Sequence, residues 1–168
     1  MKPVRILGID PGFDRLGIAV LEKNGAEETL LHSTCVTTSK KETFGERILA
    51  IGNALETILA TWKPDEVALE NLFFTISKKT AMRVSEVRGV LTYIIEKNNL
   101  PIFEYTPPQI KLAVAGYGKG TKEDVALMVG KILKMKDIDK LIDDEMDAIA
   151  IALTHSAHRG MRILDIRG

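Results

Sequence analysis

The sequence has a single cysteine, Cys35, no long apolar run and no excess of charge of either sign. One cysteine cannot form an internal disulfide, so a reducing compartment is expected. No apolar run approaches the roughly 20 residues that span a bilayer, and the first residues show no signal-peptide architecture. These absences argue against a secreted disulfide-stabilised protein and against a membrane protein, and they predict a cytoplasmic location.

The charges are evenly balanced, with 23 basic and 23 acidic side chains. Such a balance argues against a protein that coats nucleic acid by bulk charge, but it is compatible with a nuclease that has an acidic metal site and basic flanks. The chain has 168 residues, of which 45% are hydrophobic. This length and composition predict one domain, 1–168, with a single substantial core.

Hydrophobic periodicity predicts three strands followed by strands that alternate with helices. The expected strands are 4–10, 16–21, 30–36, 67–70 and 101–105, and the expected helices are 42–62, 77–98, 107–115, 122–133 and 143–159. This order predicts an α/β fold with a mixed five-stranded sheet flanked by helices. Helix 77–98 is apolar on two faces, the second of which carries Met82, Val90 and Ile95. We therefore expect it to pack on its own core and also on a partner.

Four carboxylates stand at positions from which they could share one site. Asp10 ends the first strand, and Glu70 ends the apolar run 67–69. Asp144 and Asp147 are one helical turn apart and so share a face of the last helix. Mg²⁺ prefers a few carboxylates together with water and substrate phosphate oxygens. The pattern predicts a divalent-metal site that could hydrolyse phosphodiesters.

Each of these acids also has an ordinary structural explanation. An aspartate before Pro-Gly commonly forms a turn, and a glutamate can close a strand at an exposed end. Acids at the start of a helix favour the helix dipole and serve as caps, although Asp147 lies one turn further in. The metal-site prediction therefore depends on the four positions taken together.

An ordered set of motifs across about residues 4–158 resembles the RuvC family of Holliday-junction resolvases. The motifs are Gly8-Ile9-Asp10-Pro11-Gly12 with Gly17, Ala68-Leu69-Glu70 before Phe73, Phe103-Glu104-Tyr105, Gln109-Ile110-Lys111, and the closing segment from Asp144 to His155. Actin-like ATPases and YqgF-type proteins share versions of the first motif alone. The full set in this order is specific.

The resemblance implies a ribonuclease-H-like fold and an endonuclease that resolves four-way (Holliday) DNA junctions during recombination and repair. For the reaction, it implies paired, symmetric cuts made by Mg²⁺-dependent hydrolysis, with two ions per subunit at catalysis. It also implies a homodimer and a RuvA–RuvB branch-migration complex as partner. The family's catalytic and metal-binding acids carry over to Asp10, Glu70, Asp144 and Asp147.

The resemblance also implies DNA contacts around these acids. The family's aromatic residue carries over to Phe73, beside Phe74, and exposed aromatics can stack on unpaired bases. The alternative is a loop that one of the two anchors in the core. The family's DNA-contacting lysines match Lys111 and Lys122.

Basic side chains near the start of helix 77–98 are further candidates for phosphate contacts. They are Lys78, Lys79, Arg83 and Arg88. The alternative is an ordinary solvated helix face. His155 and His158 lack a cysteine pair that would suggest zinc, and we expect them to be interface or helix-end residues.

Three rival functions can be weighed against a junction nuclease. An actin-like ATPase normally duplicates this fold, and 168 residues leave no room for a second lobe. An RNA-acting ribonuclease-H-type enzyme would share the acids, but the lysines and aromatics favour junction DNA. A junction-binding module without catalysis would not need the intact set of four acids.

Overall fold

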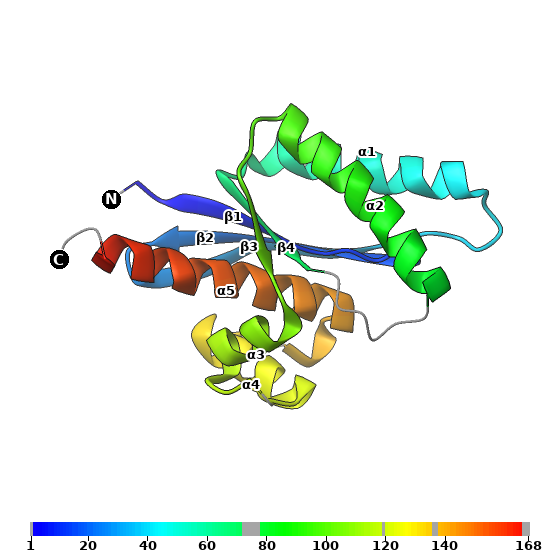
Figure 1. Ribbon diagram of the computed structural model, residues 1–168. Helices are drawn as coiled ribbons and strands as arrows, with labels where there is room; N and C mark the ends of the chain where they lie inside the picture. Colours follow the sequence, from blue (N-terminus) through cyan, green and yellow to red (C-terminus); the bar gives the residue numbers. More distant parts are fainter. Residues whose placement is uncertain (1, 72–77, 119, 136–137, 166–168) are drawn as a thin grey trace.

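A mixed five-stranded sheet forms the middle layer of the protein (Figure 1). The computed structural model describes the backbone of residues 2–71, 78–118, 120–135 and 138–165, and the side chains of these residues except 78, 79, 139 and 160–165. The strands are β1 (Val4–Asp10), β2 (Arg15–Asn24), β3 (Glu27–Thr37), β4 (Glu66–Glu70) and β5 (Ile102–Tyr105). Their order is β3-β2-β1-β4-β5. Strands β1 to β3 are antiparallel, whereas β4 and β5 run parallel to β1, which confirms the predicted mixed sheet.

Helices cover both faces of this sheet, as Figure 1 shows. One face carries α1 (Phe44–Trp62) and α2 (Lys78–Lys97). The other carries α5 (Asp143–Asp165), with α3 (Pro107–Ala115) and α4 (Lys122–Ile132) packed outside it. Within the described residues, no helix is long and apolar enough to cross a membrane.

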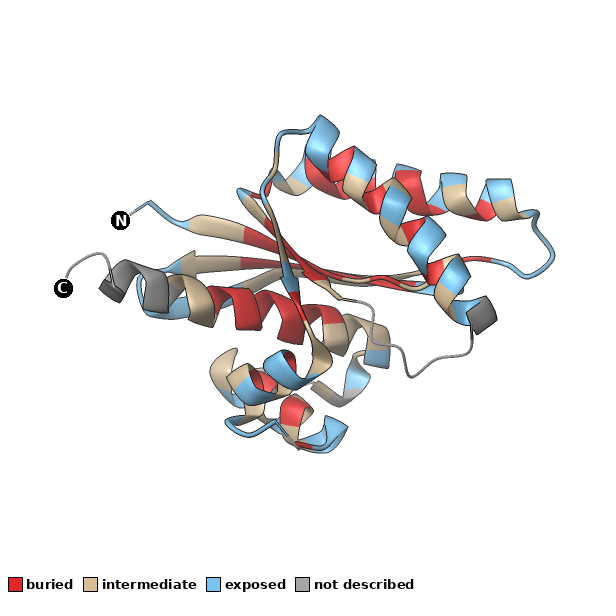
Figure 2. Ribbon diagram, in the orientation of Figure 1, coloured by how far each residue is buried: buried red, intermediate tan, exposed pale blue. Residues whose placement is uncertain are grey.

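The side chains of β1 alternate between the two helical layers. Leu7 and Ile9 are fully buried beneath α1 and α2, whereas Ile6 is fully buried on the α5 side. Figure 2 shows the resulting band of buried residues along the central strands and on the inner faces of the helices. Burial on both faces explains why β1 and β4 are almost continuously apolar.

Helix α5 lies close against the sheet because small residues meet there. A Cβ added to Gly8 would lie 2.2 Å from the carbonyl oxygen of Ala148, and one added to Gly17 would lie 2.0 Å from that of Asp144. Atoms do not approach so closely, so both strand positions require glycine. The contact with Gly17 fixes the first turn of α5 against the middle of the sheet.

The second apolar face of α2 is largely used within the chain, which corrects part of the prediction. Ile95 is fully buried, and Val90 and Ile94 lie within van der Waals distance of a Cβ placed at Gly52 of α1. The missing side chain at Gly52 lets the two helices approach, so this face of α2 packs on α1. Of the three residues assigned to the second face, only Met82 is exposed, at 68%.

Candidate active site

The four predicted acids meet at one edge of the sheet. Asp10 ends β1 and Glu70 ends the parallel neighbour β4, and the carboxyl ends of parallel strands lie at the same edge. Asp144 and Asp147 are on the first two turns of α5. Gly17 pairs with Asp10 across β1 and β2 and contacts the backbone of Asp144. Tight packing at this glycine therefore brings the start of α5 beside Asp10.

The charges of these acids act on one another. Burial, and next the charge of Glu70 and a hydrogen bond with it, raise the pKa of Asp10 to about 8, and Asp147 and Asp144 add to the rise. Burial also raises the pKa of Glu70, while the hydrogen bond with Asp10 lowers it. The two carboxyls therefore interact as a pair, in which burial and the charge of Glu70 favour the protonated form of Asp10.

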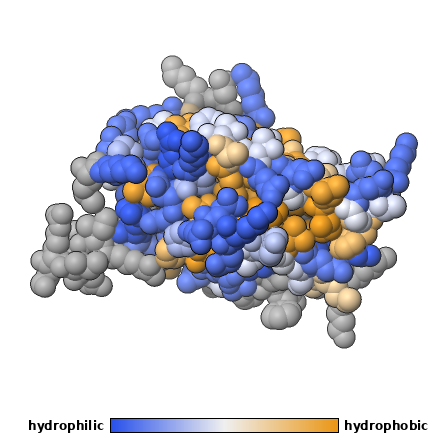
Figure 3. All heavy atoms as spheres, turned by 90° about the horizontal axis from the view of Figure 1, so that it is seen from above, coloured by the Kyte–Doolittle hydropathy of each residue, from blue (hydrophilic) through white to orange (hydrophobic). Residues whose placement is uncertain are grey.

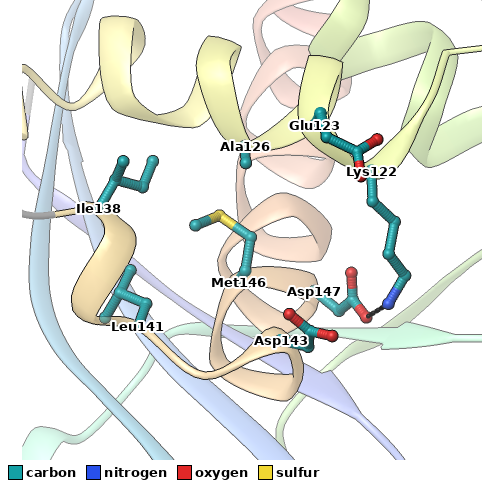
Figure 4. Close-up of a pocket in the computed structure, with 8 residues that line it drawn as sticks. All are labelled: Lys122, Glu123, Ala126, Ile138, Leu141, Asp143, Met146 and Asp147. Atoms are coloured by element: carbon teal, nitrogen blue, oxygen red, sulfur yellow. Dashed lines mark hydrogen bonds and ion pairs between the residues drawn. The ribbon is translucent and has the colours of Figure 1, made fainter.

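The two acids on α5 each pair with a basic side chain. Nη1 of Arg15 lies 3.3 Å from Oδ2 of Asp144, and Nζ of Lys122 lies 3.2 Å from Oδ2 of Asp147. Figure 4 shows Lys122 reaching from α4 to Asp147, with Asp143 beside them. Burial raises the pKa of Asp147, and Lys122 opposes that rise. The charge of Asp147 in turn raises the pKa of Lys122.

The ion pairs with Arg15 and Lys122 affect how the acids could bind a metal ion. Among the described residues, no three or more acidic, histidine or cysteine side chains are grouped as metal ligands. The pairs with Arg15 and Lys122 give a physical reason, since each directs a carboxylate oxygen to a cation of the protein. The donor set nevertheless fits Mg²⁺, which prefers carboxylates. Burial and the neighbouring acids raise the pKa of Asp10, and a bound cation would counteract both effects.

A cleft beside the acids contains both predicted DNA-contacting lysines. It has a volume of about 160 Å³. Residues from β4, α3, α4 and α5 line it, namely Glu70, Pro107, Ile110, Lys111, Lys122, Val125, Asp147, Ala150 and Ile151. Lys111 and Lys122 thus border the same cleft as two of the acids, an arrangement suited to a phosphate backbone lying across the site.

The other predicted DNA contacts lie in α2 and in the sequence segment before it. Phe73 and Phe74 lie outside the described residues, as do the side chains of Lys78 and Lys79, whose backbone begins α2. Arg83 is described. Its Nη1 lies 3.1 Å from Oε2 of Glu86, and its Cζ lies 4.2 Å from the centroid of the Phe44 ring.

Arg88 has a structural role that the sequence did not reveal. We expected it on a basic helix face, but its side chain is only 12% exposed. It donates to the backbone carbonyl of Glu70 and, at 2.6 Å, to Oε1 of Glu104. Arg88 therefore fixes the end of β4, where Glu70 enters the site.

The prediction for His155 was wrong, because this residue belongs to a buried network within the chain. It is 3% exposed and contacts side chains of β4 and β5. Its Nδ1 is 2.7 Å from Oη of Tyr105, and its Nε2 is 2.8 Å from Oε2 of Glu66. Glu66 also accepts from Arg159. His158 contacts the carbonyl of Thr154 one turn earlier within α5, which continues to Asp165.

Comparisons with known proteins match most of this chain. A model of the family described as "Crossover junction endodeoxyribonuclease RuvC" matches residues 6–155. The protein of that name from Petrotoga mobilis is 43% identical over 154 residues, which cover 92% of this chain and 94% of the relative.

Two solved structures have the same overall fold as this chain. The structure of Thermus thermophilus RuvC aligns with a TM-score of 0.86 and 37% identity, over 94% of this chain and 96% of that one. That of T. thermophilus RuvC in complex with Holliday junction substrate aligns with a TM-score of 0.89 and 36% identity, over the same shares. The sheet with its two helical layers is accordingly a ribonuclease-H-like fold.

Proposed function

The chain belongs to the RuvC family of crossover junction endodeoxyribonucleases, and on that premise we propose that it resolves four-way (Holliday) DNA junctions by hydrolysing phosphodiester bonds during recombination and repair. The observation that carries this proposal is the meeting of four acids from β1, β4 and α5 at one edge of the sheet. A relative solved with a Holliday junction supports DNA, in preference to RNA or ATP, as the substrate class.

The proposed metal ligands are Asp10, Glu70, Asp144 and Asp147, and the proposed cofactor is Mg²⁺, with two ions per subunit at catalysis. When bound, such ions activate the attacking water and stabilise the leaving oxygen. The residues contribute negative charge at fixed positions. Because a metal ligand must be ionised and the pKa of Asp10 is raised, binding of a cation would favour release of a proton from Asp10.

The proposed DNA contacts surround these acids. Lys111 and Lys122 would bind phosphates from the cleft that they share with Glu70. The same role is proposed for Lys78, Lys79 and Arg83 on α2, while Phe73 and Phe74 would stack on bases opened at the junction. Arg83 would have to leave Glu86 to reach a phosphate, so we expect it to contribute less than the lysines.

We also propose a homodimer, since two symmetric cuts in a junction with near two-fold symmetry need two sites related by a dyad. On α2, Met82 and Tyr93 are each 68% exposed. Gly89 lies between them on the same side of the helix, and a Cβ added at Gly89 would have no atom within 4 Å. Figure 3, which views the α1–α2 side, shows hydrophobic surface among hydrophilic side chains there. This stripe is the proposed dimer face.

We further propose that the protein acts in the cytoplasm together with a RuvA–RuvB complex.

The test is incubation with a synthetic four-way junction, with Mg²⁺ or with EDTA. We expect paired nicks at symmetric positions in two opposite strands, only when Mg²⁺ is present. A linear duplex of the same sequence and an RNA–DNA hybrid serve as controls and should be cut far less. Equal or preferential cutting of the hybrid, or an intact junction after prolonged incubation with Mg²⁺, would contradict the proposed function.

A further inference from the structure

Arg15 stands at the rim of the acidic site, at the first residue of β2. Its neighbour across the sheet is Thr37 of β3, and Gly17, two residues on, pairs with Asp10. The side chain reaches α5, where Nη1 lies 3.3 Å from Oδ2 of Asp144. The carboxylate of Asp144 is only 19% exposed, whereas the Arg15 side chain is 58% exposed. The pair thus joins a recessed acid to a cation that faces solvent.

The other arginines around the site are held differently. Arg47 is 8% exposed and donates to Asp14, to Thr38 and to the carbonyl of Phe13. Arg88 is 12% exposed and donates to two partners on β4 and β5. Within the described part of the chain, Arg15 makes one ion pair only, although a guanidinium has five N–H donors. Arg47 and Arg88 are fixed parts of the scaffold, whereas Arg15 can exchange its partner.

We propose that Arg15 is an exchangeable counter-ion, which neutralises Asp144 until a divalent cation takes that carboxylate and which then binds a phosphate of the DNA strand lying across the acids. This inference rests on the proposed function. A dication attracts Asp144 more strongly than one solvent-exposed guanidinium does. The freed guanidinium keeps a planar fork of donors that matches a phosphate. Arg15 then couples metal binding to DNA binding.

The first test measures metal binding without DNA, by calorimetric titration of Mg²⁺. In Arg15→Gln the competing cation is gone, so Mg²⁺ should bind about two- to fivefold more tightly, the range expected for loss of a partly exposed ion pair. Arg15→Lys should restore nearly the wild-type affinity. Lys97→Gln is the matched control, since Lys97 is 61% exposed and pairs with Glu56 at 4.0 Å, away from the acids. Unchanged or weaker Mg²⁺ binding by Arg15→Gln would overturn the proposal.

The second test measures junction binding by fluorescence anisotropy, in EDTA and in Ca²⁺. Arg15 pairs with Asp144 when no cation is present. Arg15→Gln should therefore weaken junction binding more in Ca²⁺ than in EDTA, and the fold-loss of affinity in Ca²⁺ should be about three times that in EDTA. An equal loss in both buffers would make Arg15 a constant phosphate contact, and no loss in either would remove it from the DNA interface. Either result overturns the proposal.

These tests also separate failure of this inference from failure of the proposed function. If the wild-type protein neither binds Mg²⁺ nor cuts a junction, the proposed function fails. If it does both and Arg15→Gln shows unaltered Mg²⁺ affinity, with a melting temperature near that of the wild type, only the role of Arg15 fails.

Discussion

Helix α5 has one polar cluster at its N-terminal end and another further along the helix, and the two clusters differ in how their charges are balanced. In the second cluster, Glu66 accepts hydrogen bonds from His155 and Arg159, and Tyr105 contacts the other ring nitrogen of His155. Each member of this cluster has a partner of suitable charge or hydrogen-bonding character. A buried polar network that is satisfied in this way holds the helix to the sheet and needs nothing from outside the chain.

At the N-terminal end, acids face acids. Asp10 lies near Glu70, Asp144 and Asp147, and its pKa is raised to about 8 by burial and by these neighbours. Arg15 and Lys122 offset part of this charge from the rim, and Arg88 acts on Glu70. Such an arrangement lowers stability, and perturbed carboxyls that gather in a cleft are typical of functional sites. The comparison supports a division of roles along α5, in which the His155 cluster stabilises the fold and the acids at the N-terminal end are the proposed site for an external cation.

The largest expected effect comes from changing one acid at the unbalanced end. Asp10→Asn should reduce junction cleavage in Mg²⁺ by about a hundredfold or more, because a metal ligand supplies several kcal/mol of transition-state stabilisation. Junction binding, which depends on lysines, should change little. Glu66→Gln, in the balanced cluster, is the control and should cut at nearly the wild-type rate. Near wild-type cleavage by Asp10→Asn would refute the catalytic assignment.

A second effect is the pH dependence of stability without metal. Asp10 ionises near its ordinary value of 3.8 in the unfolded chain but near a pKa of about 8 in the folded protein. The folded state therefore holds an extra proton between these values, and the free energy of unfolding falls as pH rises toward 8, by at most about 1.4 kcal/mol per pH unit. Asp10→Asn should flatten this slope. Urea denaturation in EDTA between pH 5 and 9 measures it, and parallel profiles for the two proteins would contradict the coupling.

The balanced cluster should show the opposite behaviour. Glu66→Ala removes the acceptor for His155 and Arg159, and should lower the free energy of unfolding by about 1–3 kcal/mol, equally with and without Mg²⁺. Glu56→Ala, an exposed acid in a 4.0 Å pair, should cost less than about 0.5 kcal/mol. Chemical denaturation of the three proteins gives the values. A loss that Mg²⁺ reverses would mean that the two clusters are not independent.

The smallest effects are expected at the lysines of the cleft. Lys111→Ala and Lys122→Ala should each weaken junction binding several-fold across sequences and make its dependence on the logarithm of salt concentration shallower by about one. Lys97→Ala, on the far end of α2, should leave the slope unchanged. Binding titrations at four salt concentrations suffice, and an unaltered slope for both cleft lysines would remove them from the interface.

Local patterns in the sequence predicted the sheet and the positions of the acids. β1 and β4 are short apolar runs that end in Asp10 and Glu70, and a strand end projects its last side chain from the core. The partners of these acids were not predictable in this way. Arg15 and Asp144 are 129 residues apart in sequence, and their contact depends on α5 packing against Gly17.

The same limit applies to the balanced cluster and to α2. His155 is 89 residues from Glu66 in the sequence, so only the packed fold reveals its role. The second apolar face of α2 suggested a partner protein, but the absence of a side chain at Gly52 lets α1 cover much of it. Periodicity shows that a face is buried, whereas the element that buries it is decided by tertiary packing.

Thermal melts of the wild-type protein and Asp147→Asn, with and without Mg²⁺ at constant ionic strength, test the central claim most directly. The pKa of Asp147 is raised, mainly by burial, so its ionised form is disfavoured in the folded state although Lys122 offsets part of this. Asp147→Asn should therefore raise the melting temperature of the metal-free protein. Mg²⁺ should stabilise the wild type, because it binds the folded state, and should stabilise the variant less. A neutral or destabilising substitution, together with no response to Mg²⁺, would show that these acids are only surface caps of α5.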